Sequence, residues 1–110
     1  MAVTVLIYYT GEGKNAVRFA QEMCERGVVE AIRKEEGNLQ YDYFFSMEET
    51  QSVLLIDRWE NQQALDRHHA SPMMAQIIAL REKYDLHMRV ERYREDDAGI
   101  PVNDRSFIRH

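Results

Sequence analysis

The chain has 110 residues, 45% of them hydrophobic, and a formal charge of −5 at pH 7. A chain of this length fits one domain with a modest core, so we expect it to gain stability by self-association. The excess of acidic residues argues against a nucleic-acid partner, because phosphate binding depends on clustered lysine and arginine. No apolar run is long enough to span a bilayer, and we expect no membrane partner.

Cys24 is the only cysteine, which excludes an internal disulfide and a metal site built from several cysteines. We expect Cys24 to be a small core residue of a reduced, cytoplasmic protein. Residues 1–9 lack both the basic start and the length of a signal peptide. Because the sequence contains no HExxH, EF-hand or glycine-rich dinucleotide motif, we expect no metal and no redox cofactor.

The first half of the chain predicts a strand, a long helix and a second strand. Residues 3–10 alternate, and both resulting faces are largely apolar. Residues 15–36 repeat apolar side chains at helical spacing, with Gly27 as a point where the helix can bend or break. Gly37 then supplies a left-handed cap. The second strand follows, with an inward row that is strongly aromatic: Leu39, Tyr41, Tyr43 and Phe45.

The second half predicts a third strand, a helix in two pieces and a fourth strand. A polar turn leads into a strand over residues 52–60. Asn61 is a favourable N-cap for a helix over residues 61–70. A second helical piece begins at Pro72, with Ser71 as its expected N-cap, and ends near residue 84. The last strand ends near residue 94.

This order, β-α-β-β-α-β, predicts an α+β, ferredoxin-like antiparallel sheet with the helices on one face. Residues 1–94 would form the domain and residues 95–110 a C-terminal tail. The opposite sheet face would expose apolar rows such as Leu6 with Tyr8 and Leu54 with Ile56. Because so large an apolar patch is unusual on a monomer, the alternation predicts a homodimer whose sheets face each other.

The stretch from Asp57 to Pro72, together with Glu35 to Asp42, resembles the antibiotic biosynthesis monooxygenase family. The resemblance spans roughly residues 3 to 94. It implies a dimeric α+β barrel and a cofactor-independent monooxygenase. Its implied substrates are molecular oxygen and a small quinol-like or polyphenolic aromatic.

His68 and Asp57 are the expected catalytic residues. His68 shares a helical face with Ala64 and Leu65, and a semi-buried imidazole can exchange a proton near neutral pH. The alternative is a helix histidine that is hydrogen-bonded at the rim of the domain. Asp57 shares a strand face with Trp59 at a position where the family often has glutamate. Once inward, this carboxylate must find a partner or be protonated.

Other side chains are expected to bind the substrate. Trp59 borders the substrate cavity in the family, and it can serve as a core anchor at the same time. The phenols of Tyr41 and Tyr43 share a strand face and could bind a quinone oxygen, or simply complete the core. Arg89 and Arg92 fall on opposite faces of the last strand, so at most one can stabilise a phenolate in a given pocket. The lining is completed by Met73 and Ile77.

Two departures from related sequences narrow the chemistry. The family often has a second histidine directly after the proline of this segment, where this chain has Met73. The heme-degrading branch of the superfamily uses an asparagine, a tryptophan and a histidine. Here His68 replaces that tryptophan and Ile78 replaces the histidine, which disfavours heme degradation.

Two other functions remain open from the sequence. The first is isomerisation or degradation of small autoinducer-type sugar phosphates, in which His68 would move a proton between carbon and oxygen. The second is a ligand-binding dimer without turnover. An acidic chain without a recognisable phosphate site slightly favours an apolar substrate over a phosphorylated one.

Overall fold

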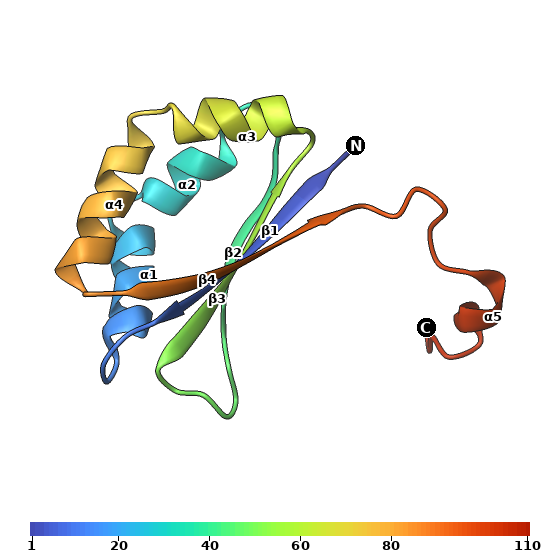
Figure 1. Ribbon diagram of the computed structural model, residues 1–110, viewed down its shortest axis with the longest axis horizontal. Helices are drawn as coiled ribbons and strands as arrows, with labels where there is room; N and C mark the ends of the chain where they lie inside the picture. Colours follow the sequence, from blue (N-terminus) through green and yellow to red (C-terminus); the bar gives the residue numbers. More distant parts are fainter.

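The computed structural model describes residues 1–110 and is organised around a four-stranded antiparallel sheet (Figure 1). The strands lie in the order β2-β3-β1-β4, so β2 and β4 form the edges. Their bounds are β1 Val3–Thr10, β2 Asn38–Phe45, β3 Ser52–Trp59 and β4 His87–Arg94. The predicted β-α-β-β-α-β arrangement is confirmed.

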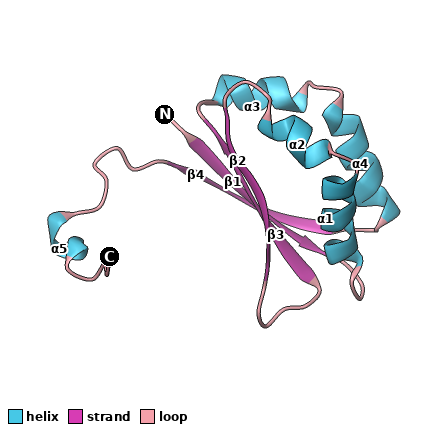
Figure 2. Ribbon diagram, turned by 180° about the vertical axis from the view of Figure 1, so that it is seen from behind, coloured by secondary structure: helices cyan, strands magenta, loops and turns pink.

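Four helices cover one face of this sheet, and the opposite face carries none (Figures 1 and 2). The first crossover contains α1 (Asn15–Glu25) and α2 (Val28–Arg33), and the second contains α3 (Gln62–His69) and α4 (Met73–Lys83). The helices pack mainly over β1, β2 and β3, which leaves the helix side of β4 largely uncovered. No helix combines the length and apolar character needed to cross a membrane.

Two glycines shape the first crossover. Gly27 has a φ of 75°, in the left-handed region, and divides the expected long helix into α1 and α2. Gly37 has a φ of 85° and lies against the start of α3. A Cβ atom at Gly37 would stand 2.6 Å from the Cβ of Ala64. Gly37 therefore permits both the turn and the close approach of α3 to β2.

In the second crossover, α3 begins with the predicted N-cap, but α4 does not. The side chain of Asn61 accepts a hydrogen bond from the backbone N–H of Ala64 over 2.8 Å, which confirms its capping role. The expected cap by Ser71 is wrong. Its hydroxyl is buried without a partner, and Pro72 precedes the first residue of α4. Ser71 contacts the start of α4 only through its backbone carbonyl, which accepts a hydrogen bond from the backbone N–H of Met74.

The core lies between the sheet and the helices. Its largest fully buried side chains are Trp59, Tyr9, Tyr41, Phe19, Met23, Ile32, Leu55, Leu65, Ile77 and Val53. Both β1 and β3 alternate buried and half-buried residues along their length, as a strand with one covered face should. Tyr41 and Ile77, both expected to line the site, are buried in this core.

Three expected core positions are exposed. Leu39 and Phe45 are 49% and 64% exposed, at the two ends of edge strand β2. A register shift between Asn38 and Gln40 accompanies the exposure of Leu39. Cys24 is also exposed, because the buried stripe of α1 consists of other residues: Ala16, Phe19, Ala20 and Met23.

The C-terminal segment leaves the sheet after β4 and projects away from it (Figures 1 and 2). It contains the short helix α5 (Val102–Arg105), in which no residue is buried. Val102 and Phe107 are 75% and 88% exposed. The division into a domain of residues 1–94 and a tail of residues 95–110 stays a prediction.

Candidate functional site

His68 is buried at the centre of a polar and aromatic cluster between α3 and the sheet. Its side chain is 3% exposed, and its Nδ1 lies 2.7 Å from Oε2 of Glu35. Glu35 stands in the turn between α2 and β2. The contact therefore joins the two crossovers of the fold, which are separated by 33 positions in the sequence.

The Glu35 contact determines how the imidazole can act. A carboxylate oxygen accepts the Nδ1 proton, which leaves Nε2 of a neutral ring as the basic nitrogen. Burial lowers the pKa of His68 below its ordinary value of 6.5, although the charge of Glu35 opposes that change. His68 is thus held neutral near pH 7 with one nitrogen available to take a proton.

Trp59 and Asp57 form the sheet side of the cluster. The Trp59 indole stacks on the His68 ring with centroids 4.8 Å apart and an interplanar angle of 25°. Its N–H donates a hydrogen bond to Oδ1 of Asp57 over 2.6 Å. Burial raises the pKa of Asp57 to about 7, against the opposing effect of the indole hydrogen bond. Asp57 can therefore hold or release a proton near neutral pH.

Strand register places three expected site residues in one row across the sheet. Tyr41, Asp57 and Arg92 occupy the same row, with Val5 between Asp57 and Arg92. The ring of Tyr41 lies 6.3 Å from His68, edge to face. Sheet pairing thus places a phenol, a carboxyl group and a guanidinium in one row on the helix-covered face of the sheet.

The remaining lining candidates surround this row. The ring of Tyr43 contacts Tyr41 edge to face, at 5.8 Å between centroids. Burial raises the pKa of Tyr43, and its hydroxyl is buried without a hydrogen-bond partner. On α4, Ile77 is fully buried and Met73 is half-buried against the core.

The two arginines lie on opposite sides of the sheet, as the alternation predicts. Arg92 is on the helix side, and its Nη2 donates a hydrogen bond to Oε1 of Gln62 at the start of α3, over 2.7 Å. Arg89 is on the bare side, where its guanidinium covers the ring of Tyr8 at 4.0 Å and pairs with Glu91. Arg89 therefore does not belong to the His68 cluster.

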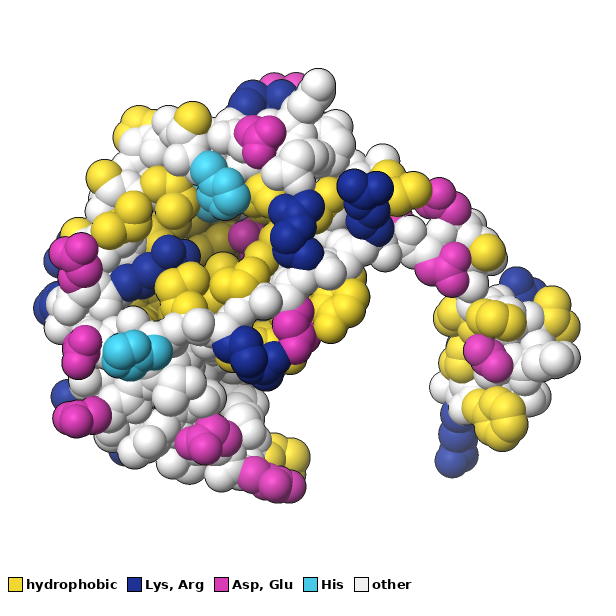
Figure 3. Space-filling model, in the orientation of Figure 1, with side chains coloured by type: hydrophobic (Ala, Val, Ile, Leu, Met, Phe, Trp, Pro, Cys, Tyr) yellow, Lys and Arg dark blue, Asp and Glu magenta, His cyan; other side chains and the backbone are white.

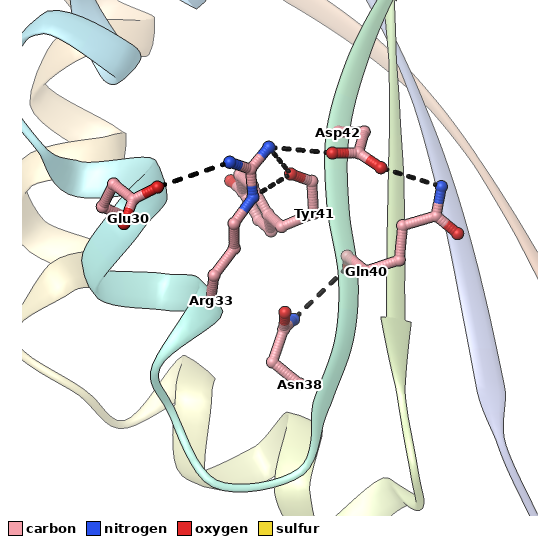
Figure 4. Close-up of polar contacts among 6 residues, drawn as sticks. All are labelled: Glu30, Arg33, Asn38, Gln40, Tyr41 and Asp42. Atoms are coloured by element: carbon pink, nitrogen blue, oxygen red, sulfur yellow. Dashed lines mark hydrogen bonds and ion pairs between the residues drawn. The ribbon is translucent and has the colours of Figure 1, made fainter.

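A polar clamp between α2 and β2 holds the turn that carries Glu35 (Figure 4). The Arg33 guanidinium donates two hydrogen bonds to the Tyr41 carbonyl, over 2.9 and 3.1 Å, and one to Asp42 over 2.8 Å. Because β2 is an edge strand, the Tyr41 carbonyl has no strand partner on that side. Arg33 satisfies it and fixes the end of α2 two residues before Glu35.

The sequence assigned no role to Glu35, which contacts His68, or to Arg81, which contacts Tyr9 in the core. Glu35 lies in the segment that carries the family resemblance, but its partner is distant in sequence. Arg81 on α4 donates a hydrogen bond to the hydroxyl of Tyr9 over 2.9 Å. Arg81 comes four residues after the buried Ile77, and such residues share a helical face. This spacing was the one sequence feature that could have placed Arg81 on the inward side of α4.

A hollow lined by hydrophobic side chains lies between α3–α4 and β4, with basic and histidine side chains around it (Figure 3). The largest of three surface cavities, about 580 Å³, is elsewhere, on the bare sheet face beside Tyr8 and Leu54. That cavity is separated from His68 by the sheet itself. No three His, Cys, Asp or Glu side chains converge in a geometry that could hold a metal ion.

Comparison with known proteins supports the fold. The family model described as Antibiotic biosynthesis monooxygenase matches residues 2–80. A candidate antibiotic biosynthesis monooxygenase from Deinococcus radiodurans is 20% identical, with a TM-score of 0.77 over 91% of this chain and 97% of that chain. SnoaB, a cofactor-independent oxygenase from Streptomyces nogalater, is 14% identical, with a TM-score of 0.71 over 87% and 94%. No functionally curated protein matches the chain.

Proposed function

Because the chain belongs to the antibiotic biosynthesis monooxygenase family, we propose that it is a cofactor-independent monooxygenase acting on a small quinol-like or polyphenolic aromatic. The observation that carries this proposal is the buried His68, held by Glu35 and stacked on Trp59. SnoaB, a cofactor-independent oxygenase of the same fold, adds support.

The first step is proton removal from a phenolic hydroxyl. Nε2 of His68 is the base, because Nδ1 is engaged with Glu35. Trp59, Tyr41, Tyr43, Met73 and Ile77 provide the aromatic and apolar lining. Within such surroundings the phenolate is electron-rich and can donate an electron to dioxygen.

The second step joins the ring to oxygen. The phenolate and dioxygen give a radical pair, which recombines into a carbon–oxygen bond and, after protonation, a ring hydroperoxide. Loss of the ring hydrogen as a proton and cleavage of the O–O bond give a quinone and water. One oxygen atom enters the product, the other leaves as water, and the substrate supplies every electron. Asp57 is suited to exchange the protons of this step, because its pKa is near 7.

The proposal includes a homodimer formed through the bare sheet face. Leu6 and Ile56 lie directly opposite each other on that face, and Tyr8 and Leu54 form the adjacent pair. Phe44 and Tyr93 on the same side are 43% and 53% exposed. A second sheet would cover this surface and the cavity beside Tyr8.

Oxygen uptake by the purified protein tests the proposal. Naphthols, quinols and sugar phosphates would each be supplied under ¹⁸O₂, and the products examined by mass spectrometry. We expect a phenolic substrate to be consumed with one labelled oxygen in the product, and no reaction under nitrogen. Turnover of a sugar phosphate without oxygen uptake would instead establish the isomerase alternative. Binding without turnover of any compound would support the non-catalytic dimer.

A further inference from the structure

Arg81 is a half-buried arginine without a carboxylate partner. Its Nη2 donates a hydrogen bond to the Tyr9 hydroxyl, and its guanidinium carbon lies 5.4 Å from the centre of the Tyr9 ring. Its Nε is buried and has no hydrogen-bond partner. None of the ion pairs in the structure involves Arg81. Since a guanidinium is always charged and carries five N–H donors, this cation has unused binding capacity.

The charge of Arg81 acts on the His68 cluster. Burial lowers the pKa of His68, and the positive charge of Arg81 lowers it further. Burial raises the pKa of Asp57, and Arg81 opposes that rise. The charge of Arg81 therefore acts on both His68 and Asp57.

A second unsatisfied polar group lies elsewhere in the core, on β2. The Tyr43 hydroxyl is buried without a partner. Its ring is connected to Tyr9 through Phe19, with successive centroids 6.0 and 4.9 Å apart. Buried polar groups without partners are uncommon in proteins. The unsatisfied Nε of Arg81 therefore marks a donor that a polar ligand atom could complete.

We infer that Arg81, oriented by Tyr9, binds a ligand oxygen that carries a single delocalised negative charge, as in a phenolate. This inference rests on the proposed function and narrows its substrate class. Arg81 offers one positive charge, Arg92 is bonded to Gln62, and the carboxyl groups of Glu35 and Asp57 lie in the His68 cluster. A phosphate monoester, with up to two negative charges at neutral pH, would leave one charge facing those carboxyl groups. The site thus fits an acidic aromatic hydroxyl better than a sugar phosphate.

Arg81 and His68 can act on one ligand without contacting the same atom. When His68 removes a proton, the negative charge spreads over the conjugated ring system. An oxygen elsewhere on that system then gains charge and binds the guanidinium more strongly. Arg81 would stabilise the anion as it forms.

Three matched probes test this inference through the fluorescence of Trp59, the single tryptophan of the chain. They are 4-nitrophenol, its methyl ether 4-nitroanisole, which cannot ionise, and 4-nitrophenyl phosphate. Each is titrated into the full-length wild type, Arg81→Gln, Arg81→Lys and the control Arg67→Gln, whose side chain is exposed on α3. Absorbance of the nitrophenolate gives the pKa of the bound phenol independently.

We expect the wild type and Arg67→Gln to bind nitrophenolate about tenfold or more tightly than nitroanisole, as a charged hydrogen bond predicts. They should also lower the pKa of bound nitrophenol. Arg81→Gln should lose both effects while nitroanisole affinity stays unchanged, and Arg81→Lys should retain part of each. Equal losses for phenolate and ether, no loss at all, or tighter binding of the phosphate would overturn the inference. Failure of the wild type to bind any probe would also overturn it, whereas oxygen uptake decides separately on the proposed function.

Discussion

Nδ1 of His68 and Oε2 of Glu35 lie 2.7 Å apart, so one hydrogen bond joins a residue of α3 to a residue of the turn before β2. This contact fixes which imidazole nitrogen is basic. It also ties proton transfer to the α2–β2 clamp made by Arg33. The proposed base and the group that orients it are therefore supplied by different crossovers.

Replacing Glu35 with Gln should lower the pKa of His68 further. The amide oxygen can still accept the Nδ1 proton, but the negative charge that opposes the effect of burial is lost. A weaker base should slow turnover about tenfold. Histidine NMR titration measures the pKa, with the exposed neighbour substitution Glu36→Gln as control. An unchanged or higher pKa for His68 in Glu35→Gln would contradict the assigned contact.

Replacing Asp57 with Asn should change how stability depends on pH. A carboxyl pKa raised from 3.8 to about 7 means that the folded state keeps a proton that the unfolded chain releases. Stability from this group is complete below pH 3.8 and is lost as pH rises to about 7, by up to about 4 kcal/mol. Asn can still accept the Trp59 hydrogen bond without titrating.

Urea unfolding of wild type and Asp57→Asn at pH 4.5 and pH 8 measures this difference. The variant should gain stability relative to wild type at the higher pH. The exposed tail substitution Asp97→Asn should track wild type at both values. His68 has a lowered pKa, so its contribution to stability depends on pH in the opposite sense: it is present above pH 6.5 and is lost as pH falls below that value. Taking the difference between variant and wild type removes that contribution, provided the substitution leaves His68 unchanged. A difference that does not vary with pH would contradict the raised pKa of Asp57.

Replacing Trp59 with Phe should weaken stability and ligand binding together. The indole is fully buried, stacks on His68 and donates to Asp57, so Phe leaves a void and an unpartnered carboxyl group. We expect a loss of about 1–3 kcal/mol in the free energy of unfolding. The control is Phe107→Leu, at an exposed aromatic of the C-terminal segment. Ligand affinity that is unchanged in Trp59→Phe would remove Trp59 from the binding site.

Replacing Ile56 with Glu should dissociate the proposed dimer. Ile56 lies opposite Leu6 in the middle of the bare face, where a second sheet would bury the new charge without a partner. Analytical ultracentrifugation at micromolar concentration should show a wild-type dimer and a folded variant monomer. Gln21→Glu on the exposed side of α1 should remain a dimer. A wild type that sediments as a monomer would refute this interface.

Local patterns were sufficient to predict the strands and most helix boundaries. The alternation in β1 and β3 is regular because the helices cover one face of both strands along their whole length. The same reasoning was wrong for Leu39 and Phe45, which lie at the ends of edge strand β2. Alternation shows which residues share a face, but it does not show how far the helices extend over that face.

The sequence predicted the candidate site residues that lie close together in one segment. Asp57, Trp59 and His68 lie within one strand–helix unit, and their proximity follows from local geometry. Glu35 reaches His68, and Arg81 reaches Tyr9, from other elements, through contacts 33 and 72 positions apart in sequence. Such contacts depend on how the crossovers pack, and a local pattern does not encode that packing.

Turnover by His68→Gln tests the central claim most directly, with His69→Gln as the matched control on the exposed side of the same helix. Gln keeps the size and a hydrogen-bonding group but cannot act as a base near neutral pH. With a phenolic substrate, we expect His68→Gln to consume oxygen about a hundredfold more slowly, while His69→Gln stays near wild type. The wild-type rate should still hold at pH 6.5 and fall only at lower pH, because the pKa of His68 is lowered below 6.5. Full oxygen consumption by His68→Gln would contradict the assignment of His68 as the base.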